Sequence, residues 1–110
     1  MAPRATTADP FNAIAEPRRR RILDLLATGE RPVSELVRRL RVAQPHVSRD
    51  LRILREVGLV RARDAGRQRY YRLDPRPLRQ VHAWLARYEA AWNARFDALD
   101  TVLDDLKTQE

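Results

Sequence analysis

The chain has 110 residues, enough for one domain with a modest hydrophobic core. It contains no cysteine, which excludes disulfides, thiolate metal ligands and a cysteine nucleophile. The longest stretches without a charged side chain, 42–48 and 80–86, have seven residues each. A membrane-spanning helix needs about 20 apolar residues, so we expect no membrane segment and a cytoplasmic location.

Positive charge is concentrated in the first two-thirds of the chain. The net charge is +7, from 22 Lys and Arg against 15 Asp and Glu. Residues 1–73 hold seventeen arginines and eight acids, whereas residues 74–110 hold five basic and seven acidic residues. A basic region followed by a mildly acidic one indicates a polyanion-binding surface joined to a separate element.

Hydrophobic spacing and Pro and Gly positions predict the elements in chain order. We expect a disordered start over residues 1–8 and a short helix over 9–15 capped by Asp9. Three helices should follow: one from Pro17 to a stop at Gly29, then 33–40 and 45–57. Two strands, 59–63 and 69–73, should form a hairpin around Gly66, and 78–107 should form one long helix.

This order predicts a winged helix-turn-helix. About four residues, Arg41–Gln44, join the third and fourth helices, and the hairpin follows directly. The fold class is therefore mainly α with a small β-hairpin. We assign residues 9–75 to a DNA-binding region and 76–110 to a C-terminal dimerisation helix of the same domain.

The fourth helix has the pattern of a recognition helix. Val47, Leu51 and Leu54 form its core face, and arginines with small polar residues occupy the opposite face. Arginine can pair with guanine in the major groove, and small polar side chains can reach base edges or phosphates. The alternative is an ordinary solvated face on which Arg52 pairs with Glu56. The predicted DNA-binding residues here are Gln44, Pro45, His46, Ser48, Arg49 and Arg52.

The hairpin and the second helix add further arginines. Arginine at a flexible loop tip can contact phosphates or enter the minor groove, although charged edge strands also protect against aggregation. The run Arg18–Arg21 spreads around its helix, so we expect one or two of its members to contact phosphate and the rest to cover the core. The predicted DNA-binding residues of the wing are Arg63, Gly66, Arg67, Gln68 and Arg69.

The last helix carries an apolar stripe with a seven-residue repeat. Thirty helical residues span about 45 Å, whereas a body of about 75 residues has a radius of gyration of only about 11–12 Å. The stripe therefore predicts a symmetric homodimer, which would place two recognition helices on a palindromic DNA site. The predicted interface residues are Phe11, Leu78, Val81, Leu85, Tyr88, Trp92, Phe96 and Leu99.

Several segments together resemble the ArsR-type winged-helix repressors. They are FNAIAEPRRRRIL (11–23), QPHVSRDL (44–51), LREVGLV (54–60) and GRQRYYRL (66–73). The resemblance covers about residues 9–105. It implies a dimeric bacterial repressor that binds operator DNA, often near its own gene.

The chain departs from the metal sensors of that family. The cysteine pair that those sensors carry would fall near Glu35–Leu40, but this chain has none. A second familiar site uses two histidines eleven residues apart, whereas the residues eleven away from His82 are Tyr71 and Asn93. We therefore expect a branch that does not sense metals, with no cofactor and an effector that the sequence does not identify.

Two other functions remain open at this point. The same basic surface could serve a non-specific nucleic-acid-binding protein, or the long helix could make this a winged helix that binds a protein partner. An enzyme is not expected, because no Gly-rich phosphate loop, Ser/His/Asp set or paired-carboxylate pocket is evident.

Overall fold

A computed structural model describes residues 9–108 and divides the chain into two compact units that meet between Arg79 and Gln80. The disordered start predicted for residues 1–8 lies outside the described residues. No helix in the described part is long and apolar enough to cross a membrane.

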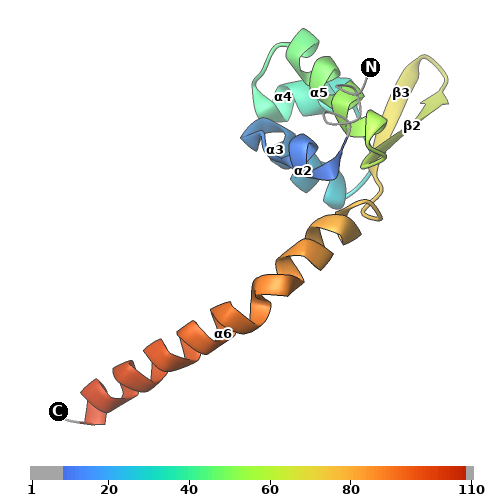
Figure 1. The fold of residues 1–110 in the computed structure, drawn as a ribbon. Helices are drawn as coiled ribbons and strands as arrows, with labels where there is room; N and C mark the ends of the chain where they lie inside the picture. Colours follow the sequence, from blue (N-terminus) through green and yellow to red (C-terminus); the bar gives the residue numbers. More distant parts are fainter. Residues whose placement is uncertain (1–8, 109–110) are drawn as a thin grey trace. The chain divides into compact units, whose positions relative to one another are not determined.

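Within residues 9–108, the first unit contains four helices and three strands, and the second consists of the long last helix from Gln80 onward (Figure 1). In chain order the elements are α2 (Pro10–Ile14), α3 (Pro17–Ala27), β1 (Arg31–Pro32), α4 (Val33–Leu40), α5 (Gln44–Glu56), β2 (Val60–Ala65), β3 (Gln68–Leu73) and α6 (Leu78–Thr108). This is the winged helix-turn-helix with a long C-terminal helix that the sequence predicts.

Local sequence signals explain where the helices begin and end. The Asp9 carboxylate accepts a hydrogen bond from the backbone N–H of Asn12 at 2.9 Å, which caps α2. Helix α4 ends at Arg41, whose φ of 57° and ψ of 43° are left-handed, and its N–H donates to the Val37 carbonyl at 2.9 Å. This left-handed residue turns the chain sharply from α4 into α5. Helix α5 begins at Gln44, one residue earlier than predicted, because Pro45 occupies its first turn.

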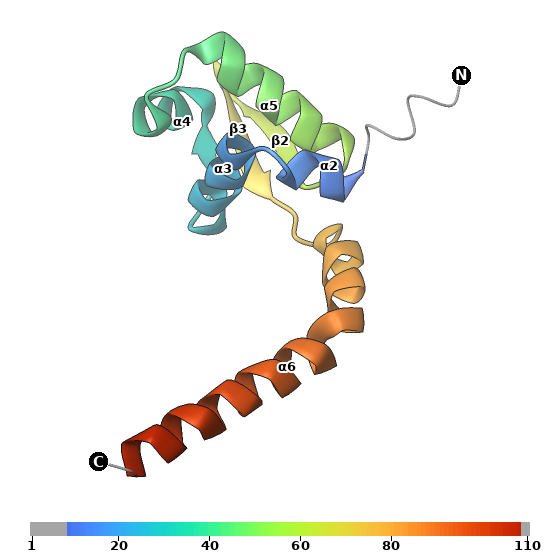
Figure 2. The same cartoon turned by 60° about the vertical axis from the view of Figure 1, so that its left-hand side comes forward.

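The core lies where α3, α4 and α5 meet the sheet (Figure 2). One face of α5 is buried and consists of Val47, Asp50, Leu51 and Leu54. Three of these are the apolar residues predicted to face the core, and the fourth is a carboxylate. Burial of one face leaves the opposite face of α5 exposed to solvent.

The wing is part of a three-stranded antiparallel sheet with the order β1-β3-β2, rather than the expected two-stranded hairpin. The additional strand is Arg31–Pro32, which pairs with Tyr71 and Tyr70. Two residues are too short a segment to produce a strand pattern in the sequence, so only the tertiary pairing defines it.

The turn of the hairpin is tighter than expected. Ala65 pairs with Gln68, which leaves Gly66 and Arg67 as a two-residue turn. Gly66 has a φ of 63°, a conformation that favours glycine, at the first central position of this turn. Gln68, expected in the loop, therefore belongs to β3, one residue before the predicted start of that strand at Arg69.

Candidate nucleic-acid interface

The exposed face of α5 carries every DNA-binding residue predicted on that helix. Gln44, Pro45, His46, Ser48, Arg49 and Arg52 are all exposed. The hairpin lies beside this helix in the first unit and extends away from the helices, with its turn at the far end (Figure 1). The first unit therefore presents one helix and one hairpin tip to solvent.

The arginines on this face have no internal counter-charge. Among residues 9–108, the side chains of Arg49, Arg52 and Arg55 make no ion pair or hydrogen bond with another residue. The alternative in which Arg52 pairs with Glu56 is therefore not what the structure contains. Unpaired guanidinium groups keep all their donors available for an external acceptor.

The wing arginines differ from one another in this respect. Arg67, in the turn, is exposed and has no ion-pair partner in the described part of the chain. Arg63 instead forms a bidentate ion pair with Glu30, with nitrogen–oxygen distances of 2.6 to 3.0 Å, and its guanidinium lies 5.2 Å from the centre of the Tyr70 ring. The hydrogen bond from Arg63 lowers the pKa of Glu30.

Arg69 is also paired, and the two remaining predicted wing residues are exposed. The Nε of Arg69 donates to the carboxylate of Asp64 at 3.0 Å across the hairpin. Gly66 and Gln68 are exposed beside the turn. Of the predicted wing arginines, Arg67 is the one whose charge remains without a close carboxylate.

Most arginines of the run at the start of α3 donate hydrogen bonds to acceptors within the protein. Arg18 donates to Asp50, whose side chain is only 2% exposed, and Arg19 approaches the same carboxylate at 3.7 Å. Arg19 also donates to the carbonyls of Ala13 and Asn12 at 2.7 and 3.1 Å. A buried carboxylate is tolerated only when it is paired, so these arginines hold α3, α5 and the end of α2 together.

Arg20 has the same kind of role. Its guanidinium donates to the carbonyls of Ile14 and Ala15, at 2.6 and 3.2 Å, at the C-terminal end of α2. Cations placed at a helix C-terminus satisfy carbonyls that have no partner within the helix. Arg20 and Arg21 are both exposed, and Arg21 makes no ion pair or hydrogen bond with another described residue; that one or two members of Arg18–Arg21 contact phosphate stays a prediction.

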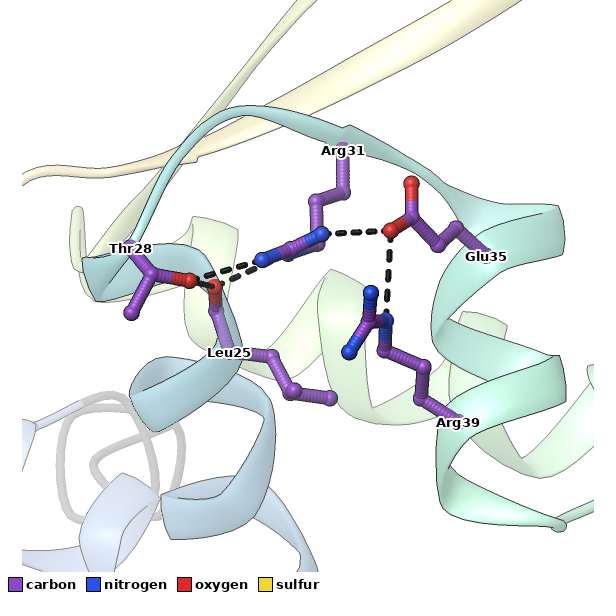
Figure 3. A network of polar contacts seen from close by, with 5 residues as sticks. All are labelled: Leu25, Thr28, Arg31, Glu35 and Arg39. Carbon is purple, nitrogen blue, oxygen red and sulfur yellow. Dashed lines mark hydrogen bonds and ion pairs between the residues drawn. The ribbon is translucent and has the colours of Figure 1, made fainter.

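A second arginine network fixes the start of the helix-turn-helix (Figure 3). Arg31 donates to the Leu25 carbonyl at 3.0 Å, to the Thr28 hydroxyl at 2.7 Å and to the Glu35 carboxylate, while Arg39 donates to Glu35 at 3.2 Å. Partial burial of Glu35 acts to raise its pKa, but the nearby positive charge of Arg31 and these hydrogen bonds outweigh it, so the pKa is lowered. The network ties the end of α3 to α4.

Glu35 also begins the segment in which the resembling sensors would carry cysteines. In this chain the Glu35 carboxylate forms ion pairs with Arg31 and Arg39. No group of three or more His, Asp or Glu residues within 9–108 is arranged to hold a metal ion.

The predicted DNA-binding residues leave out three arginines that lie close to Arg52, although two of them, Arg61 and Arg72, belong to the arginine-rich hairpin that the sequence indicates. Arg55, Arg61 and Arg72 line one hollow of about 570 Å³ between the second half of α5 and the base of the hairpin. Neither the helical periodicity of α5 nor the strand pattern of the hairpin places these two elements side by side. The register of β2 against β3, which places Arg61 opposite Arg72, is defined only by the tertiary structure.

The predicted dimer residues are largely exposed. Leu78 and Val81 are half-buried, and Leu78 packs against the core of the first unit. Within α6 no residue is buried, and Trp84 packs edge-to-face against Tyr88 with ring centres 5.4 Å apart. The exposed members of the predicted interface are Phe11 (39%), Leu85 (36%), Tyr88 (43%), Trp92 (44%), Phe96 (63%) and Leu99 (52%).

Comparisons with known proteins agree with this geometry. Residues 16–62 match the family described as bacterial regulatory protein, arsR family. The chain is 41% identical over 78 residues to the HTH-type transcriptional regulator Rv2034 of Mycobacterium tuberculosis, which covers 71% of this chain and 73% of that one. It is 34% identical over 101 residues to the arsenical resistance operon repressor of Escherichia coli, covering 90% and 83%.

The fold is likewise shared with solved structures of such regulators. The ArsR-like transcriptional regulator from Rhodococcus sp. RHA1 superposes with a TM-score of 0.70 at 29% identity, covering 92% of this chain and 93% of that one. These relatives are transcriptional regulators rather than enzymes. The chain therefore belongs to the arsR family of bacterial regulatory proteins and is a DNA-binding transcriptional regulator.

Proposed function

We propose that this protein is a dimeric repressor that reads a palindromic operator with α5 and the tip of its wing. The observation that carries the proposal is the row of exposed, unpaired side chains on α5, beside a hairpin whose turn holds the unpaired Arg67. Arg49 lies in the first half of α5, the part of a recognition helix that reaches base edges in the major groove. Arg67 would contact the phosphates or the minor groove next to it.

The dimer is supported by the composition of α6. This helix has 31 residues and a repeating apolar stripe, and none of its residues is buried. Apolar residues repeated in this way are stabilised by packing against a second helix. Two copies paired through α6 would place two recognition helices about 34 Å apart, one turn of DNA, which requires a two-fold symmetric operator.

Fluorescence anisotropy tests the DNA proposal directly. The probe is a labelled duplex from the DNA upstream of the protein's own gene, and the control is a scrambled duplex of equal length and composition at near-physiological salt. We expect a preference for the upstream duplex of about a thousandfold or more. Equal and steeply salt-sensitive binding to both would instead indicate a general nucleic-acid binder, and no binding to either would favour a protein partner.

Sedimentation equilibrium tests the dimer. Leu99→Glu places a charge on the exposed stripe of α6, whereas Ala94→Glu places the same charge on the opposite face of that helix. We expect the wild type and Ala94→Glu to sediment as dimers and Leu99→Glu to dissociate and lose operator affinity. A monomeric wild type that retains operator preference would contradict the dimer proposal.

A further inference from the structure

The buried face of α5 contains one charged side chain, that of Asp50. This residue is 1% exposed and interrupts an otherwise apolar face. The buried charged residues within 9–108 are Asp50 and Asp74, and only Asp50 lies on a helix. Burying a carboxylate costs free energy unless it is paired, so its presence on this face requires a physical account.

Both oxygens of this carboxylate face arginines of α3. The Nε of Arg18 donates to Oδ2 of Asp50, and Nη1 of Arg19 lies 3.7 Å from Oδ1. The same guanidinium of Arg19 donates from Nε to the carbonyl of Ala13 and from Nη2 to that of Asn12, both in α2. These three charged residues, which we call the Asp50 clamp, therefore join α5 to both α2 and α3.

Stability alone does not account for the Asp50 clamp. Replacing a buried ion pair by apolar side chains of similar volume is often neutral or stabilising. A leucine at position 50 would simply continue the apolar face of α5. What the clamp adds is direction, because a charge-assisted hydrogen bond fixes the positions of donor and acceptor, whereas hydrophobic contacts are non-directional.

The direction matters because α5 carries the predicted base-reading residues. Asp50 directly follows Arg49, which is exposed on the opposite side of the core. A rotation of α5 by about 20° about its axis moves an atom about 6 Å from that axis by about 2 Å. A binding group must be held within about 0.5 Å of its productive position. The rotation of α5 therefore decides which base edges its exposed side chains reach.

We propose that Asp50 is a positioning residue for base recognition. Through Arg18 and Arg19 it holds α5 at one rotation relative to α2 and α3, and it thereby sets the sequence that α5 selects. Asp50 contacts no DNA itself, because it is buried. This inference rests on the proposed function, and it separates the residues that read bases from the residue that orients them.

The test replaces the ion pair by apolar side chains in the variant Arg18→Met/Asp50→Leu. One positive and one negative charge are removed, so the net charge of +7 is unchanged. The matched control is Arg31→Met/Glu35→Leu, the same replacement at an ion pair whose hydrogen bonds reach no residue of α5. Thermal melting of each variant establishes that it is folded.

The measurement has two parts. Duplexes are first selected by the wild type from a pool with a random central segment, which defines its preferred sequence. Fluorescence anisotropy then gives the affinity of each variant for that duplex and for a scrambled duplex of equal composition. The ratio of the two affinities reports base recognition, and a residue that only stabilises the fold does not change this ratio in a folded variant.

We expect the clamp variant to bind the scrambled duplex within about twofold of the wild type, because its net charge and exposed arginines are unchanged. Its affinity for the selected duplex should fall by about tenfold or more, the effect of losing about one base contact. The control should keep the wild-type ratio.

A smaller substitution covers the case in which the clamp variant does not fold. Arg18→Lys keeps the charge of a half-buried side chain but removes the Nε donor to Asp50. We expect this variant to melt close to the wild type and to show a reduced ratio, with a smaller reduction than in the clamp variant.

Two results would overturn the inference. One is a wild-type ratio in the folded clamp variant, or in Arg18→Lys if the clamp variant is unfolded. The other is an equal loss of the ratio in the control, which would show that any internal ion pair has the same effect. In both cases the wild type still selects a sequence, whereas a wild type that selects none would contradict the proposed function as well.

Discussion

The arginines at the start of α3 and those on the exposed face of α5 differ in what surrounds them. Arg18 and Arg19 donate to Asp50 and to the end of α2, whereas Arg49 and Arg52 contact no acceptor within the described chain. By sequence alone the run at α3 is the denser cluster of charge. What separates the two is whether the fold brings an acceptor to the guanidinium, so the number of arginines in a segment does not indicate whether it binds DNA.

The wing contains both paired and unpaired arginines. Arg63 and Arg69 are paired with carboxylates, and Arg67 in the turn is not. Surface ion pairs contribute only about 0.2–1 kcal/mol to stability, but they reduce the charge that a phosphate experiences. The paired and unpaired arginines can be told apart by measuring stability and DNA binding separately.

The largest expected effect is on stability, at Asp50. Asp50→Ala removes the buried acceptor of Arg18 and Arg19 and should lower the free energy of unfolding by about 2–3 kcal/mol. Urea denaturation at fixed protein concentration measures this change in the free energy of unfolding. The control is Arg21→Ala, an exposed member of the same run, which should change stability by less than about 0.5 kcal/mol. Equal effects of the two substitutions would remove the distinction between paired and unpaired arginines.

The next effect is on operator recognition, at Arg49. If this unpaired arginine reads a base, Arg49→Ala should cost about 1–3 kcal/mol of binding free energy and relax preference at one operator position. Stability should remain close to that of the wild type, because the side chain makes no internal ion pair. Anisotropy titrations against operator variants measure the change. An equal loss on operator and random duplexes would assign Arg49 to phosphate contact.

A smaller effect separates two arginines of the wing. Arg67→Gln should weaken binding to operator and random DNA about equally and flatten the salt dependence by about one unit. Arg63→Gln should flatten it by less, because Glu30 already neutralises that guanidinium. Both variants are titrated against the same random duplex, and their slopes of log affinity against log salt are compared. If Arg63→Gln flattened the slope as much as Arg67→Gln, the ion pair would be open when DNA is bound.

The smallest effect is the acid sensitivity of the paired carboxylates. Hydrogen bonds from Arg63 lower the pKa of Glu30, and those from Arg76 and Arg61 lower the pKa of Asp74. Such groups stabilise the folded state above their unfolded pKa, about 4.3 for Glu and 3.9 for Asp, and the contribution is lost as pH falls toward the folded pKa. We therefore expect the free energy of unfolding to decline below about pH 4.5.

Denaturation at pH values from 6 to 3 measures this decline. Arg63→Gln should make it shallower, because Glu30 then titrates nearer its ordinary pKa in the folded state. A stability that rises on acidification over this range would contradict the sign of both shifts.

Much of the fold was predictable from sequence because its signals are local. Asp9 as a cap, Pro17 and Pro45 in first turns, and Gly66 in the hairpin turn each act within a few residues of their own position. The apolar face of α5 follows from helical periodicity, and with it the exposure of the residues opposite. The candidate recognition surface on α5 therefore needed no tertiary information.

The remainder of the site depends on residues far apart in the chain. Glu30 lies 33 residues before Arg63, Asp50 lies 32 residues after Arg18, and β1 forms only by pairing with β3. The sequence by itself determined the order of the elements and where the arginines are. Only the tertiary structure decided which arginines are neutralised and which remain exposed without an ion pair, because ion pairs and strand register depend on distances that local sequence does not encode.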